Sequence, residues 1–164
     1  MQLITDTQQG PVKGRKREGV ILFAGIPYAS PPIGNLRFAP PTPPHQRTKL
    51  LEATQFGPAS PQLPGDGLTD SHEVHWDEDC LTLNICTPSA DQTKRPAMVW
   101  IHGGAYRHGT GSIPWYDGTR FAKESDIVTV TINYRLGALG FARIPGAPTS
   151  GINGILDQIS ALEW

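Results

Sequence analysis

Two apolar runs in the second half of the chain, at residues 97–101 and 127–134, contain no regular alternation with polar residues. Such runs are typical of strands buried on both faces, as in a parallel sheet covered by helices. A helix is predicted between them over residues 119–124, so that strand, helix and strand form a βαβ unit. A second helix is predicted near the end of the chain, where apolar residues recur at helical spacing: Ile152, Ile155, Leu156, Ile159 and Leu162.

The first half predicts shorter strands between proline-rich turns, at residues 20–23 and 81–87. In the second of these, Leu81, Leu83 and Ile85 alternate with polar or small residues, which is typical of a half-buried antiparallel strand. The predicted fold class is therefore α/β: short antiparallel strands lead into a mostly parallel central sheet with flanking helices. A helix on such a sheet should lead into another strand, and none follows here, so we expect an interrupted domain; an α/β domain that ends in a helix is the alternative.

Composition narrows the function classes. The 14 Lys and Arg residues nearly balance the 15 Asp and Glu residues and form no basic stripe, so nucleic-acid binding is not expected. No apolar run approaches the roughly 18 residues of a membrane span, and no signal peptide is visible. Cys80 and Cys86 lie six residues apart on a predicted strand, about 20 Å, too far for a disulfide. A cytoplasmic location is slightly favoured, and the oligomeric state stays open.

The glycine-rich segment 102–106 (His-Gly-Gly-Ala-Tyr) directly follows the first apolar run. In an open α/β sheet, ligands bind beyond the carboxyl ends of the strands. Consecutive backbone N–H groups can stabilise a developing oxyanion there, and one such donor is worth about 3 kcal/mol in the transition state. The segment has the sequence of the loop that forms half of the oxyanion hole in esterases. A tight turn without a ligand explains the same residues equally well.

Other sites are less well supported by the sequence. The spacing of Gly104 and Gly109 fits a phosphate-binding loop, but the required lysine is missing, and a dinucleotide fingerprint lacks its third glycine. No cofactor is therefore expected. An acidic segment matches no standard zinc or calcium spacing, and a solvated loop without a metal is predicted for its members: Asp70, His72, Glu73, His75, Asp77, Glu78 and Asp79.

Five blocks, in order along the chain, give a specific resemblance. They are Phe-Ala-Gly-Ile-Pro-Tyr-Ala at 23–29 with Leu-Arg-Phe at 36–38, Glu-Asp-Cys-Leu-Thr-Leu-Asn at 78–84, Trp-Ile-His-Gly-Gly-Ala-Tyr at 100–106, Asn-Tyr-Arg-Leu-Gly at 133–137, and Gly-Ile-Asn-Gly at 151–154 with Leu-Asp-Gln at 156–158. Together they resemble the type-B carboxylesterases, α/β-hydrolases that include cholinesterases and bacterial esterases. The resemblance implies that residues 1–164 are the N-terminal part of one such domain.

The resemblance also assigns candidate residues. The family's glycine triplet falls on Gly103, Gly104 and Ala105, and the N–H groups of Gly104 and Ala105 would be two oxyanion donors. His102 does not correspond to the family's catalytic histidine. The expected chemistry is hydrolysis of a small-molecule carboxylic ester through an acyl-serine. Tyr106, Trp115 and Tyr116 would line the entrance or simply pack.

Two ion pairs follow from the same correspondence, Arg37 with Glu78 and Arg135 with Asp157. We expect structural roles for both, because breaking a partly buried pair costs several kcal/mol.

The sequence departs from the family at several positions. Ser60 stands where many relatives carry the disulfide partner of Cys80, so Cys80 is expected to be a free, buried thiol. The aromatic residue with which cholinesterases bind a quaternary amine is replaced by Asp70, which disfavours a choline ester.

The largest departure concerns the nucleophile. No serine lies in a Gly-x-Ser-x-Gly pattern, so the catalytic triad is expected beyond residue 164 and the chain alone is expected to be inactive. The alternative is a non-catalytic, neuroligin-like binding protein of the same fold.

Overall fold

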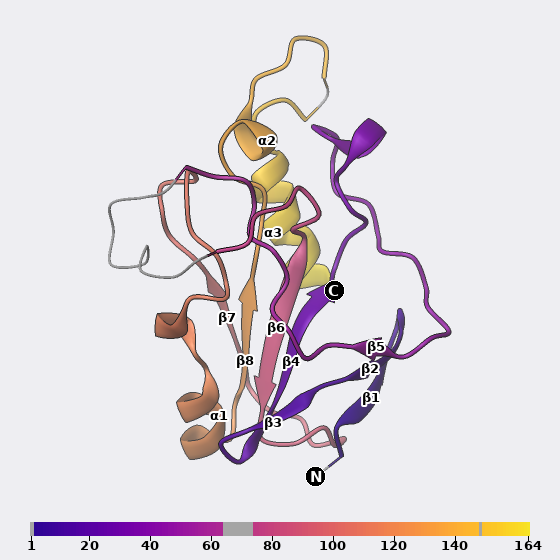
Figure 1. Cartoon of the computed structure of the whole chain (residues 1–164), viewed down its shortest axis with the longest axis vertical. Coiled ribbons are helices and arrows are strands. Elements are labelled where there is room, and N and C mark those ends of the chain that lie inside the picture. The colour runs from indigo at the N-terminus through magenta and orange to yellow at the C-terminus, as the bar shows by residue number, and fades with distance from the viewer. Residues whose placement is uncertain (1, 64–73, 148) are drawn as a thin grey trace.

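The computed structural model describes residues 2–63, 74–147 and 149–164, and Figure 1 shows their arrangement around a central sheet. The sheet has five strands in the order β3 (Arg15–Arg17), β4 (Val20–Pro27), β6 (Thr82–Thr87), β8 (Val128–Ile132) and β7 (Ala97–Ile101). A smaller sheet beside it contains β1 (Ile4–Thr7), β2 (Gly10–Lys13) and β5 (Leu51–Glu52). The helices are α1 (Thr119–Ser125), α2 (Gly137–Phe141) and α3 (Asn153–Glu163), with 3₁₀ turns η1 (Gly34–Leu36) and η2 (Pro114–Tyr116).

The central sheet changes from antiparallel to parallel pairing along its width. Strands β3, β4, β6 and β8 pair antiparallel in turn, whereas β7 pairs parallel with β8. The predicted strand–helix–strand unit is confirmed, because β7, α1 and β8 follow one another and the two strands are neighbours. This pair places the carboxyl end of β7 beside the carboxyl end of β8, where the candidate loop begins.

Helices cover both faces of the sheet. Along β4, Ile21 and Phe23 belong to the larger apolar cluster, which also contains Leu83, Ile132 and Ala161 of α3. The intervening side chains of the same strand, Val20 and Leu22, join Cys86 and Ala122 of α1 in a second cluster. Because successive side chains of a strand point to opposite faces, α1 and α3 pack on opposite sides of the sheet.

Three sequence expectations about burial are wrong. Strand β6 is not half-buried, because it lies between β4 and β8 with helices on both faces. Its polar face is accommodated by hydrogen bonds: Asn84 accepts from the Gly25 N–H (2.9 Å) and donates to Thr131 Oγ1 (2.9 Å). Asn84 of this alternating strand therefore lies in the core, where it is hydrogen-bonded, and is not exposed to solvent.

The other two corrections concern apolar side chains that are exposed. The run 97–101 was expected to be buried on both faces, but β7 is an edge strand of the sheet, and Val99, Trp100 and Ile101 are each about 40% exposed. The predicted apolar stripe of α3 faces outward at Ile159 and Leu162, and at Ile152 directly before the helix. The buried carboxylate of Asp157 on this helix pairs with Arg135, which follows β8. The buried side of α3 therefore contains small or polar residues: Asn153, Gly154, Asp157 and Ala161.

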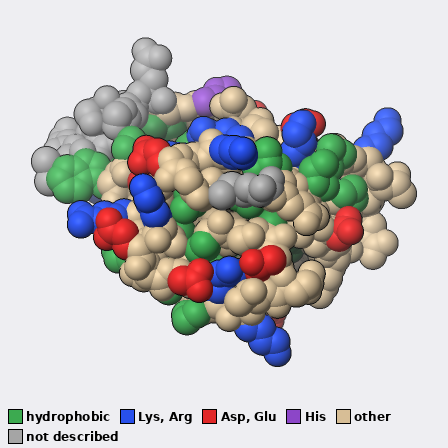
Figure 2. All heavy atoms as spheres, turned by 90° about the horizontal axis from the view of Figure 1, so that it is seen from below, with side chains coloured by type: hydrophobic (Ala, Val, Ile, Leu, Met, Phe, Trp, Pro, Cys, Tyr) green, Lys and Arg blue, Asp and Glu red, His purple; other side chains and the backbone are tan. Residues whose placement is uncertain are grey.

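The remaining expectations from composition concern the surface charge, membrane spans and the two cysteines. Figure 2 shows acidic and basic side chains interspersed on the lower face of the molecule, without a patch of one sign. Within the described ranges, no helix is both long and apolar enough to span a bilayer. Cys80 is free and buried, as expected; Cys86 is also free, and it is buried although its strand was expected to be half-buried.

Candidate oxyanion-binding site

The candidate loop leaves the sheet at the end of β7. His102 is buried, Gly103 and Ala105 are exposed, and Gly104 is partly buried. Two cavities, of about 80 and 270 Å³, lie beside α1 and η2, and none of these loop residues lines either of them. The exposure of Gly103 and Ala105 places the loop at the surface, at the carboxyl end of the parallel strand pair.

A tight turn, hereafter the oxyanion turn (residues 103–108), gives the loop its shape. The Gly104 carbonyl accepts hydrogen bonds from the N–H groups of Arg107 (2.9 Å) and His108 (3.3 Å). Gly104, Ala105 and Tyr106 all have positive φ, at 114°, 52° and 60°. Only glycine fits at position 104, because an added Cβ would lie 1.9 Å from the His108 carbonyl oxygen. Ala105 is in the left-handed region at a cost of about 1 kcal/mol.

The turn uses its carbonyl groups and leaves amide donors available. Among the residues that the structure describes, no acceptor lies within hydrogen-bond range of the Gly104 or Ala105 N–H groups. An N–H group without a protein acceptor bonds to water or to a ligand. Two successive donors at an exposed turn are therefore open to water or to a bound molecule.

His102, which is buried, stabilises the turn. Its ring stacks on Tyr134 with centroids 4.4 Å apart, and the Tyr134 hydroxyl donates to the His102 carbonyl (2.7 Å). His102 Nδ1 lies 2.9 Å from the Gly103 carbonyl oxygen, so this nitrogen carries the proton. Burial lowers the pKa of His102 to about 4. The imidazole is therefore neutral near pH 7 and acts as a hydrogen-bond donor.

This burial predicts a pH effect on stability. An unfolded histidine titrates near pH 6.5, whereas His102 in the folded state titrates near pH 4. As the pH falls, the unfolded state binds the proton first, so stability is full above pH 6.5 and is lost down to pH 4, by about 3 kcal/mol. Urea denaturation of the unchanged protein (the parent) and of its His102→Asn variant between pH 6.5 and pH 4 measures the effect. The parent should lose more stability than the variant, and equal losses would contradict the prediction.

Hydrogen bonds from other segments hold the turn and the residues that follow it. Asn133 Oδ1 accepts from the N–H of Gly111 (2.7 Å) and from the Thr110 hydroxyl (3.0 Å). The Gly137 N–H donates to the Tyr106 carbonyl (2.7 Å). A further anchor comes from Gln62, whose amide bonds to Gly109. The sequence analysis gave Gln62 no role, and no local signal could have paired it with a glycine 47 residues away.

The structure brings both predicted ion pairs together, in different settings. Arg135 and Asp157 are almost completely buried and are joined by bonds from Nε (2.8 Å) and from a terminal guanidinium nitrogen (2.7 Å). Arg135 also donates to the Ala39 carbonyl (2.7 Å), so it joins the end of β8 to α3 and to the loop before residue 40. Arg37 and Glu78 approach within 2.5 Å, but the Arg37 side chain is 47% exposed. An exposed pair of this kind contributes at most about 1 kcal/mol.

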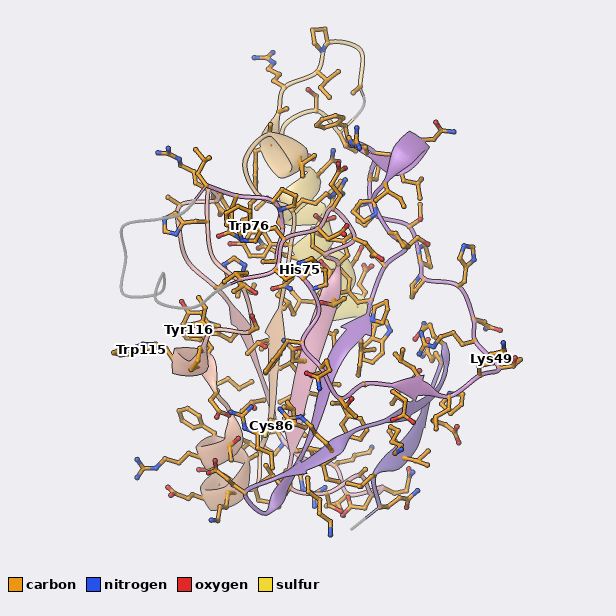
Figure 3. All side chains as sticks on the ribbon, in the orientation of Figure 1. Lys49, His75, Trp76, Cys86, Trp115 and Tyr116 are labelled. Atoms are coloured by element: carbon orange, nitrogen blue, oxygen red, sulfur yellow. The ribbon has the colours of Figure 1, made fainter. Side chains whose placement is uncertain are left out.

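The three aromatic residues proposed for an entrance do not form one group. Tyr106 packs on Phe141 (4.6 Å between centroids) and lies edge-on to Tyr134 (6.3 Å), next to the oxyanion turn. Tyr116 packs on Trp100 (5.1 Å), and Figure 3 shows Trp115 projecting away from the sheet. Trp115 and Tyr116 line the 270 Å³ cavity beside β7 and β8. Of the three, Tyr106 is the one placed at the loop.

The acidic segment shows no arrangement for a metal within the described ranges. Asp70, His72 and Glu73 lie outside those ranges. Of the remaining candidates, Glu78 pairs with Arg37, and Asp77 accepts from the Asp79 N–H (2.9 Å). His75 is exposed. In the described part of the chain, no group of three or more His, Cys, Asp or Glu side chains could hold a metal ion.

Comparisons with known proteins agree on one family. The model of the carboxylesterase family matches residues 1–164. The chain is 44% identical to the para-nitrobenzyl esterase of Bacillus subtilis, covering 99% of this chain and 34% of that protein, and 41% identical to the liver carboxylesterase of Sus scrofa (98% and 31%). Among solved structures, a Geobacillus stearothermophilus carboxylesterase superimposes with a TM-score of 0.91 at 45% identity, over 99% of this chain and 34% of that one. The chain thus spans about a third of the length of these relatives.

Proposed function

Because this chain belongs to the carboxylesterase family, we propose that it supplies the oxyanion-binding turn of a serine esterase. In this role the Gly104 and Ala105 N–H groups donate to the oxygen of a carboxylic ester as it becomes negatively charged. Residues 1–164 contain no Gly-x-Ser-x-Gly pattern. The nucleophile, the histidine and the acid therefore come from outside these residues. The substrate is a small-molecule ester.

The single observation that carries the proposal is a pair of N–H groups for which the described residues offer no acceptor, in a strained turn at a strand end. A turn with only a structural purpose has no need to hold an alanine at positive φ with its amide free. Strain of this kind persists where the surrounding structure enforces it and is common at functional sites. In acyl transfer, preorganised donors of this type lower the barrier because they need not reorient as charge develops.

The isolated chain is expected to lack esterase activity. It has donors for the tetrahedral intermediate but no serine in the elbow pattern that could form one. The apolar side chains exposed on β7 and α3 also favour a function that requires further polypeptide on these surfaces.

A fusion protein tests the proposal. Residues 1–164 are joined to the remaining two thirds of the Bacillus subtilis para-nitrobenzyl esterase, and the fusion is compared with the isolated chain on p-nitrophenyl acetate and with a fluorophosphonate probe. We expect turnover and covalent labelling of the fusion, and neither for the isolated chain. A fusion that folds with a cooperative melt but shows no turnover, or labelling of the isolated chain, would contradict the proposal. The first outcome would favour a binding function.

A further inference from the structure

The side-chain amide of Gln62 binds both polar groups of one backbone residue in the candidate loop. Its oxygen accepts from the Gly109 N–H (2.7 Å), and its nitrogen donates to the Gly109 carbonyl (2.9 Å). The second hydrogen of the same nitrogen is used by the Ser60 carbonyl (3.0 Å). Gln62 therefore fixes both the position and the orientation of Gly109, from a segment that lies 47 residues earlier in the sequence.

Gly109 in turn lies directly against the base of the oxyanion turn. Its φ is +118°, and an added Cβ would lie 2.4 Å from His102 Nδ1 and 2.7 Å from the Gly103 carbonyl oxygen. The backbone of Gly109 is thus in contact with both partners of the His102–Gly103 hydrogen bond. If Gly109 moved toward the turn, it would push on that carbonyl, and if it moved away, the carbonyl would lose its support.

The Gly103 carbonyl controls the direction of a proposed catalytic donor. It belongs to the same planar peptide unit as the Gly104 N–H, and in a trans peptide the two groups point in opposite directions. A rotation of this peptide that releases the carbonyl from His102 therefore turns the N–H away from its position by the same angle. Hydrogen bonds weaken steeply when they are misaligned, so a modest rotation lowers the stabilisation of an oxyanion.

We propose that Gln62 is a positioning residue for the oxyanion turn: its amide holds Gly109 against His102 and Gly103 and so sets the direction of the Gly104 N–H. The inference rests on the proposed function, because it assigns Gln62 a task only if the Gly104 N–H is an oxyanion donor. Among the described residues, the Gln62 amide bonds to Gly109 and Ser60 and not to the Gly104 or Ala105 N–H groups.

Hydrogen bonds that do not involve Gln62 also hold the loop in place. The Gly111 N–H donates to Asn133 and the Gly137 N–H donates to the Tyr106 carbonyl, and neither bond involves Gln62, so both should persist when Gln62 is replaced. These two bonds hold the loop on either side of Gly109. The loss of Gln62 is therefore expected to change catalysis more than stability.

The test is made in the fusion protein with Gln62→Met, which keeps the length of the side chain and removes both hydrogen-bonding groups. We expect kcat to fall about 10- to 100-fold with KM changed less than about threefold, because the donor acts on the transition state. Affinity for a trifluoromethyl ketone, which forms a tetrahedral adduct with the serine, should fall in parallel. Gln62→Glu, which keeps the acceptor for Gly109 and loses both donors, is the second variant and should also lose kcat.

A matched control comes from the same segment. In the described part of the chain, the Ser60 hydroxyl accepts from the Leu136 N–H (3.0 Å) and forms no hydrogen bond with the oxyanion turn. Ser60→Ala therefore removes a buried hydrogen bond near Gln62 and should lower the melting temperature while leaving kcat unchanged. If Gln62 were only a structural anchor, its variants would behave like Ser60→Ala, and the proposal would be overturned.

A double-mutant cycle separates this proposal from the proposed function. If Gln62 acts through the Gly104 N–H, Gln62→Met should have little further effect on kcat once Gly104→Ala has disrupted the turn. Additive losses would overturn the positioning role. If Gly104→Ala itself leaves kcat unchanged, the proposed function fails. If Gly104→Ala lowers kcat and Gln62→Met does not, only the positioning role fails.

Discussion

Gly104→Ala in the fusion protein is expected to lower kcat at least about 10²-fold, because the loss of even one oxyanion donor lowers kcat about 10²–10³-fold. The new Cβ would lie 1.9 Å from the His108 carbonyl oxygen and would also occupy a φ of +114°, so the turn cannot keep its present shape. When the turn opens, the Gly104 and Ala105 N–H groups move together, because they are adjacent. KM should change little, since the lost interaction forms in the transition state.

Gly34→Ala is the control for this substitution. Gly34 also has a positive φ, at 56°, but an added Cβ there meets no other atom within 4 Å. It therefore reproduces the backbone strain of an alanine at positive φ without the collision, far from the oxyanion turn in sequence. Steady-state kinetics on p-nitrophenyl acetate should show a normal kcat for Gly34→Ala. Activity of Gly104→Ala within threefold of the parent would mean that the turn contributes nothing to catalysis.

The position of the candidate loop was predictable, whereas its internal geometry was not. An apolar run followed by glycines indicates a strand end, and the strand–helix–strand pattern places that end at the edge of a parallel pair. The backbone angles of Ala105 and Tyr106 depend on bonds from Arg107 and His108 to the Gly104 carbonyl. Alanine and tyrosine rarely adopt positive φ, so their identities give no signal of it.

Burial was predicted less well than secondary structure, and for one physical reason. Periodicity reports which residues share a face, but the neighbours of that face are set by tertiary structure. Asn84 belongs to a polar face that lies inside the protein, where Thr131 and Gly25 bind its amide. Trp100 belongs to an apolar run that is exposed because β7 is at the edge of the sheet. Contacts such as that of Gln62 with Gly109 connect distant segments and leave no local pattern.

The largest effect on stability is expected from Arg135→Met, which should lower the unfolding free energy of the fusion protein by about 3–5 kcal/mol. The substitution leaves the Asp157 carboxylate completely buried without its guanidinium partner, and it also removes the donor to the Ala39 carbonyl. An exposed pair contributes far less, so Arg37→Met is the matched control and should cost at most about 1 kcal/mol. Urea denaturation followed by tryptophan fluorescence measures both.

The pH dependence of the Arg135→Met deficit tests its cause. Burial already raises the pKa of Asp157, while the bonds from Arg135 oppose this shift. Without Arg135 the folded-state pKa rises further above the unfolded value of about 3.9. A raised carboxyl pKa gives stability that is present at low pH and is lost as the pH rises through the folded pKa, so the deficit relative to the parent should shrink on acidification. A deficit that is the same at pH 5 and pH 8 would mean that lost packing is responsible, and that the unpaired charge is not.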